Sequence, residues 1–193
     1  MMDLVSEFEY SGAVLEDHDF SDQIATRVTF SGCRLVKCVL ARTRLQKADL
    51  TKVTIDTSDL ANAIWEESRM EKVRLSACRM TGIGLARSLV KDAVIQSCSA
   101  LYADFRSVKF KKAKFIDCDL SDADFQQADL RNVVFENCRL RGAQMSFAKL
   151  DGTDFRGSDL ENIRVGIEHL RGAIVDSTQA AYLAGLMGLR VMW

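Results

Sequence analysis

An apolar residue at every fifth position is the feature that most constrains this chain. From Leu15 to Val175 each fifth side chain is hydrophobic, and most of the ten phenylalanines fall in this phase. The position two residues earlier is usually Ala, Val, Ser, Thr or Cys, and the other three positions are mostly polar. A period of five fits neither an α-helix nor a simple strand, whose side-chain periods are about 3.6 and about 2.

A square coil accommodates this period. If each five-residue repeat forms one side, its two apolar positions point inward, and each full turn advances the coil by the spacing of paired strands, about 4.8 Å. The chain contains no proline, which is consistent with backbone hydrogen bonding along the whole coil. The pattern predicts an all-β solenoid of about eight coils over residues 13–175, between an N-terminal cap at 1–12 and a separate segment at 176–193.

The period ends at Asp176, and a short C-terminal α-helix is predicted there. Asp176 can serve as the N-cap and Gln179 can complete a capping box, whereas Gly188 is a typical helix stop. We expect this segment to cap the open coil and to form a homodimer. The residues expected at the dimer interface are Tyr182, Leu183, Leu186, Met187, Val191, Met192 and Trp193.

The cysteines are expected to be buried, reduced thiols. In a coil of twenty residues, one inner column contains five of the six, namely Cys38, Cys78, Cys98, Cys118 and Cys138. A disulfide needs Cβ atoms about 3.8 Å apart, whereas stacked coils hold them near the strand spacing. Metal ligands normally converge on one point, and these residues lie in a line. We therefore expect neither a metal nor a cofactor.

Catalysis is not expected. His18 and His169 lie near opposite ends of the predicted rod, and neither has a recognisable nucleophile motif nearby. The sequence also lacks a phosphate-binding loop, a dinucleotide-binding fingerprint and a nucleophile elbow. We predict that the protein is not an enzyme.

Net charge and hydropathy indicate where the protein acts. Its formal net charge of −1 gives no global attraction to nucleic acid or to an anionic membrane. Residues 1–10 lack the basic start of a signal peptide, and no apolar run is long enough to cross a bilayer. We expect a bacterial cytoplasmic protein that does not bind nucleic acid directly.

Outward charges are partly sorted between sides. One side carries Asp119 and Asp122, and it continues two coils on with Asp159 and Glu161, although Arg139 and Arg141 interrupt it. With Asp104 and Asp124 on the adjoining side, these six residues form a candidate partner-binding acidic face. The opposite side carries a basic cluster of Lys109, Lys111, Lys112 and Lys114, with Lys91 and Arg131 in the neighbouring coils. Such a surface can bind a partner, or it can serve only to keep a rod soluble and to prevent edge-to-edge stacking.

The repeat resembles that of the pentapeptide repeat family. Its motif is a small residue, then Asp or Asn, then Leu or Phe, then two polar residues, as in Ala48-Asp49-Leu50-Thr51-Lys52 and Ala123-Asp124-Phe125-Gln126-Gln127. The resemblance covers about residues 10–175. It implies a right-handed quadrilateral parallel β-helix.

The C-terminal arrangement is similar to that of the Qnr and MfpA quinolone-resistance proteins. The similar stretches are Gly172 to Asp176, Gln179-Ala180 and Gly188 to Val191. The resemblance implies a tail-to-tail dimer that mimics DNA, binds DNA gyrase or topoisomerase IV, and confers fluoroquinolone resistance. The alternative is an interaction module, or scaffold, that binds another protein.

Overall fold

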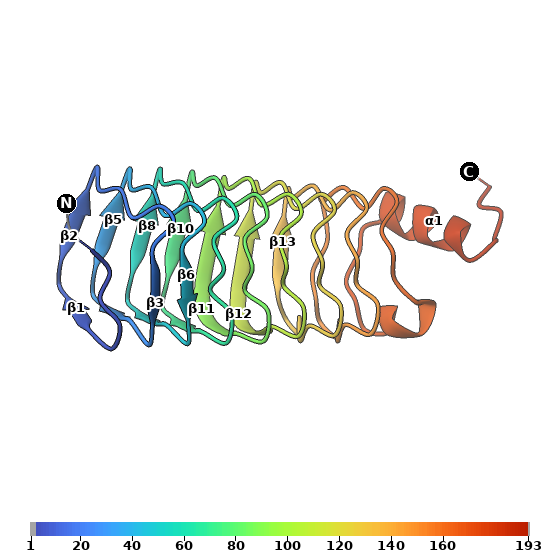
Figure 1. Ribbon diagram of the computed structural model, residues 1–193. Coiled ribbons are helices and arrows are strands. Elements are labelled where there is room, and N and C mark those ends of the chain that lie inside the picture. The colour runs from blue at the N-terminus through green and yellow to red at the C-terminus, as the bar shows by residue number, and fades with distance from the viewer. Residues whose placement is uncertain (1–2, 193) are drawn as a thin grey trace.

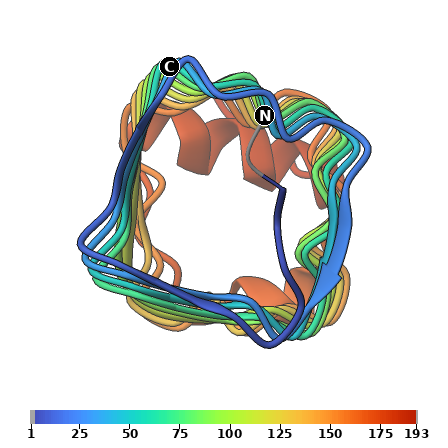
Figure 2. The ribbon, with the colours of Figure 1, turned by 60° about the vertical axis from the view of Figure 1, so that its left-hand side comes forward.

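The chain folds into a straight, four-sided rod with the N-terminus at one end and the C-terminus at the other (Figure 1, Figure 2). The computed structural model describes residues 3–192. Its strands are β1 (Glu9–Ser11), β2 (Val14–Glu16), β3 (Ile24–Thr26), β4 (Thr29–Ser31), β5 (Arg34–Val36), β6 (Arg44–Gln46), β7 (Asp49–Thr51), β8 (Thr54–Asp56), β9 (Arg69–Glu71), β10 (Arg74–Ser76), β11 (Leu89–Gln96), β12 (Lys109–Ile116) and β13 (Val134–Glu136).

All strand pairs are parallel and join residues twenty apart. The first pair includes Glu9 and Thr29, and the last bridge joins Asp154 to Ile174. This offset is the same in every pair, so one coil contains twenty residues and the predicted solenoid is confirmed. Strands β11 and β12 run continuously around one corner and connect the strands of two adjacent sides into a single sheet.

The two inward positions of each repeat form one apolar core along the rod. Phenylalanines stack in its C-terminal half: the rings of Phe115 and Phe135 are 5.1 Å apart, and those of Phe135 and Phe155 are 5.3 Å apart. Trp65 is also fully buried. The small residues between the large ones allow the four walls to approach one another.

A residue with a left-handed backbone conformation ends each side of the coil. Every fifth residue from Glu7 to Asn162 has a φ between 49° and 75°. Glycine adopts this conformation without strain and Asn or Asp tolerate it, but most other residues do not. Several glycines occupy this phase, yet Thr57 and Phe147 occupy it as well. The corner geometry is therefore imposed by the coil rather than by local preference.

The C-terminal segment forms α1 (Ser177–Leu186), preceded by a short 3₁₀-helix, η1 (Ile167–Leu170). Asp176 and Gln179 form the predicted capping box. The buried side-chain amide of Gln179 donates to the carbonyl oxygens of Phe155 and Ser158, at 2.6 and 2.7 Å. The short C-terminal helix is thus confirmed, and it attaches to the last coils through these bonds and through buried Leu183.

The N-terminal end is closed by its own first residues. Leu4 and Tyr10 are buried, and the Tyr10 hydroxyl donates to the carbonyl oxygen of Asp3 at 2.9 Å. Strand β1 already pairs with β4, so coil-type pairing begins within the segment assigned to the N-terminal cap. Within residues 3–192, no helix has the length and apolar character needed to span a membrane.

Candidate functional site

The candidate acidic face is a surface of ion pairs. Arg139 Nη1 lies 3.4 Å from Asp119 Oδ2, and Arg141 bonds to both Asp159 and Glu161. The ladder along this side joins Asp119, Arg139 and Asp159 in successive coils, so the sign of the charge alternates. The carboxylates that the sequence places together are therefore largely neutralised by arginines from neighbouring coils.

The adjoining side shows the same compensation, both within one repeat and between neighbouring coils. Arg106 Nη2 lies 2.6 Å from Asp104 Oδ2, and its Nε lies 3.9 Å from Asp124. Partial burial raises the pKa of the Asp104 carboxyl, but hydrogen bonds from Arg106 outweigh this effect and hold the pKa below its ordinary value. The carboxylate of Asp104 is thus held in its charged form beside a permanent cation.

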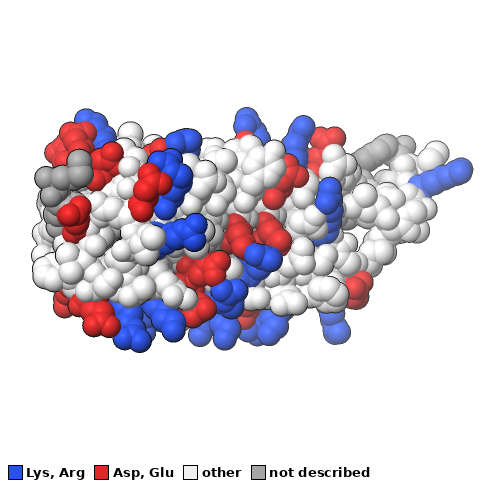
Figure 3. Space-filling view, viewed as in Figure 1, with Lys and Arg blue, Asp and Glu red and all other residues white. Residues whose placement is uncertain are grey.

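A sequence signal for these pairs is present but easy to overlook. Asp, an inward Leu or Phe, and Arg occur in that order three times, and in each case the arginine folds back onto the aspartate two residues earlier. The three pairs are Asp104–Arg106, Asp129–Arg131 and Asp154–Arg156. Acidic and basic side chains are correspondingly interspersed over the face seen in Figure 3.

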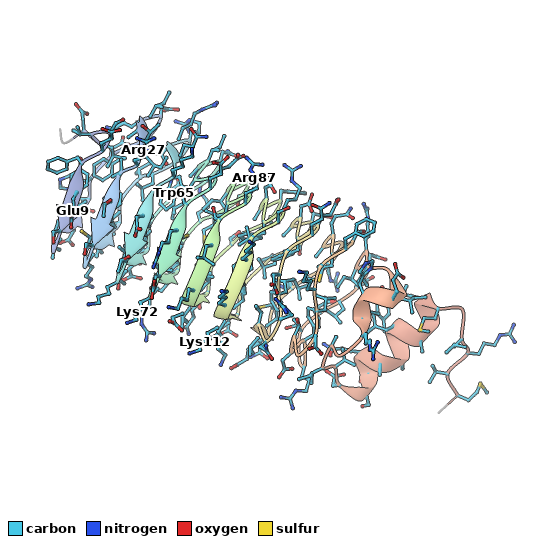
Figure 4. The ribbon with its side chains drawn as sticks, turned by 90° about the horizontal axis from the view of Figure 1, so that it is seen from below. Glu9, Arg27, Trp65, Lys72, Arg87 and Lys112 are labelled. Carbon is cyan, nitrogen blue, oxygen red and sulfur yellow. The ribbon has the colours of Figure 1, made fainter. Side chains whose placement is uncertain are left out.

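The basic cluster lies on β12, where Lys109, Lys111 and Lys112 are exposed. Lys114 forms an ion pair with Glu136 at 2.5 Å. Within residues 3–192, Lys109, Lys111 and Lys112 form no ion pair. The sequence-predicted neighbour Lys91 pairs with Lys111 in the ladder, but its ammonium bonds to Glu71. In Figure 4, Lys72 and Lys112 project outward along the same edge of the rod.

The candidate dimer residues divide into two groups. Tyr182 and Leu183 face their own coil: the Tyr182 hydroxyl accepts a hydrogen bond from Asn162 N at 2.6 Å, and Leu183 is buried. Four others are exposed, namely Leu186, Met187, Val191 and Met192. Trp193 lies outside the described residues. The exposed apolar surface is thus at the far end of α1 and in the following tail.

The two histidines remain far from each other, one near each end of the rod. His18 stacks on Phe20, and its Nδ1 lies 2.7 Å from the Glu16 carbonyl oxygen. His169 packs edge-on against Phe147, with ring centroids 5.2 Å apart. Within residues 3–192, no hydrogen bond joins either imidazole ring to a cysteine or a serine. Among residues 3–192, no three His, Cys, Asp or Glu side chains converge as metal ligands.

All six cysteines are buried free thiols. Cys38, Cys78, Cys98, Cys118 and Cys138 occupy equivalent positions, and Ser58 and Ser158 continue the same column. The serine hydroxyls accept hydrogen bonds from the backbone nitrogens of Cys38 and Cys138, at 3.0 and 2.9 Å. Burial raises the pKa of the Cys38 thiol above its ordinary value. We name Cys78, Cys98, Cys118 and Cys138, which occupy consecutive coils, the thiol column.

Comparison with known proteins identifies the family. The family model described as pentapeptide repeats matches eight copies of the repeat, over residues 26–60, 91–127 and 118–157, which together make up more than half of the chain. The chain belongs to the pentapeptide repeat family. No curated protein sequence matches it.

Several solved structures are similar to this chain. QnrB1, a plasmid-mediated fluoroquinolone resistance protein, is 16% identical, with a TM-score of 0.49 over 97% of this chain and 99% of QnrB1. HetL from Nostoc sp. strain PCC 7120, a pentapeptide repeat protein involved in heterocyst differentiation regulation, is 20% identical, with a TM-score of 0.32 over 92% of each chain. Rfr23 from Cyanothece 51142 is 15% identical, with a TM-score of 0.34 over 75% of this chain and 88% of Rfr23.

Proposed function

We propose that this protein is a non-enzymatic rod that binds a partner protein along one of its sides. The observation that carries the proposal is the alternating column of Asp119, Arg139 and Asp159. Its charges repeat at the coil spacing of about 4.8 Å on a rigid wall. Regular, rigidly held groups of alternating sign suit a large complementary surface, because complementary charge sets the register and the specificity of protein association.

The distribution of side chains supports the same proposal. The inward residues of each repeat are buried in the core, where their size and polarity are constrained. The outward residues are exposed to solvent and are free to vary. Those columns carry almost all of the charged residues. Variation among outward residues can therefore change what is bound without changing the fold.

The resemblance to the quinolone-resistance proteins suggests DNA gyrase and topoisomerase IV as partners. A DNA mimic presents carboxylates in place of phosphates. On this rod the acidic face can do so only if the enzyme displaces Arg106, Arg139 and Arg141 from their carboxylates, or accepts them in place. The arginines favour the alternative, a protein partner whose own surface carries both signs of charge.

Supercoiling by gyrase, with and without ciprofloxacin, distinguishes the two. Inhibition of supercoiling, or protection from the drug, at micromolar protein supports DNA mimicry. We expect that effect to disappear in a variant with Asp119→Asn, Asp122→Asn and Asp159→Asn. A matched variant with Lys109→Gln, Lys111→Gln and Lys112→Gln on the opposite side should retain it. No effect of the wild-type rod at micromolar concentration removes gyrase as the partner.

We further propose that the rod forms a homodimer through its C-terminal end. Leu186, Met187, Val191 and Met192 present a cluster of exposed apolar side chains, and Met192 is 89% exposed. Burial of such a cluster favours association. Sedimentation of the wild type at micromolar concentration should show a dimer, and Leu186→Glu with Val191→Glu should show a monomer. Ile24→Glu, at an exposed apolar residue near the other end, serves as the control.

A further inference from the structure

One corner of the rod carries a row of exposed cations. It is the corner around which β11 and β12 run, and in every coil it is formed by a residue with a left-handed backbone. Lys52, Lys72 and Lys112 occupy this position in three of the coils, and Figure 4 shows Lys72 and Lys112 projecting along the same edge. Arg74 and Lys111 lie beside them in the sequence, and all five side chains are exposed. We name these five residues the basic edge.

The basic edge forms no ion pair within the rod. Among residues 3–192, the lysines that do form ion pairs are Lys47, Lys91 and Lys114, and no ion pair includes Arg74. The basic edge thus differs from the acidic face, where arginines pair with the carboxylates. Its positive charge is not compensated locally and can attract an anionic partner.

The glutamates beside the basic edge already bind other cations. Glu71 forms ion pairs with Arg69 and Lys91, at 2.6 and 2.9 Å. Glu136, two coils further on from β10, pairs with Lys114 at 2.5 Å. Because these carboxylates are engaged, they do not draw the ammonium groups of the basic edge back onto the rod.

The surroundings of the basic edge favour a protein partner over a nucleic acid or a membrane. Asp92 interrupts the row of lysines, and it would repel a nucleic acid backbone, which carries a phosphate at every step. The outward positions near the corner carry no aromatic side chain on which unpaired bases could stack, and no large apolar side chain there is exposed for insertion into a bilayer. The ranges concerned are 49–57, 69–77, 89–97 and 109–117.

We propose that the basic edge binds an acidic, extended segment of a partner protein, laid along the rod. Lys52 and Lys72 are one coil apart and Lys72 and Lys112 are two coils apart, so the three lysines span about 14 Å at the coil spacing. An extended chain advances about 3.3 Å per residue, so roughly four or five residues cover this span. Alternate side chains of such a segment face the same way, and carboxylates among them can lie opposite the lysines while an uncharged residue lies opposite Asp92.

Lysine suits this kind of contact. Its ammonium is a point charge on a flexible stem, so it can follow carboxylates whose spacing differs from that of the coils. The rod uses arginine instead for its internal pairs with Asp104, Asp129 and Asp154. Because the lysines are exposed, we expect binding to be rapid and to weaken as the salt concentration rises.

Lysines at other corners of the rod provide a matched control. Lys37 and Lys47 are exposed and have a left-handed backbone, as Lys72 and Lys112 do. Gln127 shows that the coil accommodates glutamine in this conformation. The edge variant, Lys72→Gln with Lys112→Gln, and the control variant, Lys37→Gln with Lys47→Gln, therefore remove the same charge from equivalent backbone positions. Circular dichroism and thermal unfolding check that both variants fold.

The experiment measures binding of a fluorescent peptide of alternating glutamate and serine to the full-length protein, by fluorescence anisotropy at low salt. A peptide with glutamine in place of glutamate, a DNA duplex and phosphatidylserine vesicles serve as comparison probes. We expect the wild type to bind the acidic peptide more tightly than the other three. The edge variant should bind it roughly tenfold more weakly, because two exposed ion pairs are lost, and the control variant should bind it as the wild type does.

The proposal is overturned if the wild type does not bind the acidic peptide, if the edge and control variants bind it equally well, or if any comparison probe binds as tightly. Its failure is distinguishable from failure of the proposed partner binding along Asp119, Arg139 and Asp159, because the basic edge includes none of these residues. Asp119→Asn with Asp159→Asn alters that column and should leave binding of the acidic peptide at least as strong as in the wild type.

Discussion

The indole nitrogen of Trp65 donates a hydrogen bond to Thr43 Oγ1 at 2.9 Å, and both side chains are fully buried. The Thr43 hydroxyl in turn donates to the Leu40 carbonyl oxygen at 2.7 Å. A large aromatic residue thus replaces the usual Leu or Phe of the inner position without leaving its polar atom unpaired. One small residue in the preceding coil makes this substitution possible.

Thr43→Val removes that acceptor. An unpaired buried donor costs about 1–3 kcal/mol, so we expect the free energy of unfolding to fall by that amount. Thr43→Ser retains the hydroxyl and should lose less. Urea unfolding followed by circular dichroism measures both variants. Equal stability of Thr43→Val and the wild type would show that the bond contributes nothing.

Phe135 lies between Phe115 and Phe155, with interplanar angles of 11° and 3°. Truncation of such a buried ring leaves a cavity and costs about 3–5 kcal/mol, so we expect that loss for Phe135→Ala in thermal or urea unfolding. Phe147→Ala is the control, because Phe147 is 66% exposed. A loss for Phe147→Ala as large as that for Phe135→Ala would contradict the assignment of the core.

Gly142 and Gly12 both have positive φ, at 68° and 60°. A methyl group on Gly142 would lie 2.4 Å from Asp122 Oδ1, whereas one on Gly12 meets nothing within 4 Å. Both alanine variants incur backbone strain of about 1–2 kcal/mol, and Gly142→Ala should lose more because Asp122 must also move. Adding Asp122→Ala to Gly142→Ala should abolish this extra loss of stability, which a double-mutant cycle measures.

Glu71 accepts bonds from Lys91 and from Arg69, and these lower its pKa to about 2. A carboxyl with a depressed pKa stabilises the folded state above its ordinary pKa near 4.5, and that contribution is lost as the pH falls toward 2. Glu71→Gln should therefore be less stable than the wild type near neutral pH, and the difference should shrink below pH 4.5. Thermal midpoints at a series of pH values test this, and a difference that does not change with pH would contradict it.

The five-residue period was sufficient to predict the coil and the cysteine column, whereas the resemblance to the repeat family implied the parallel pairing and the capping residues predicted the helix start at Asp176. The reason is that burial depends on residue type at a constant spacing, so a core position such as Leu50 or Cys118 can be assigned without knowing its neighbours. The capping box is equally local, because it involves residues only three apart.

The sequence places Arg139 and Arg141 among the acidic residues, but it does not show which carboxylate each of them pairs with. Asp119 and Asp159 form an acidic face in the sequence, yet Arg139 and Arg141 neutralise them in the folded rod. Long side chains reach along their own side and across coils, so their pairing depends on rotamers and on the twenty-residue stacking together.

The sequence by itself thus determined which residues are inside, because the hydrophobic effect acts on each side chain according to its phase in the repeat. Only the tertiary structure decided which groups meet on the outside and at the ends. It turns Tyr182 toward Asn162 and leaves Met192 exposed. These relationships depend on three-dimensional contacts between residues that are distant in the chain, and no single repeat encodes them.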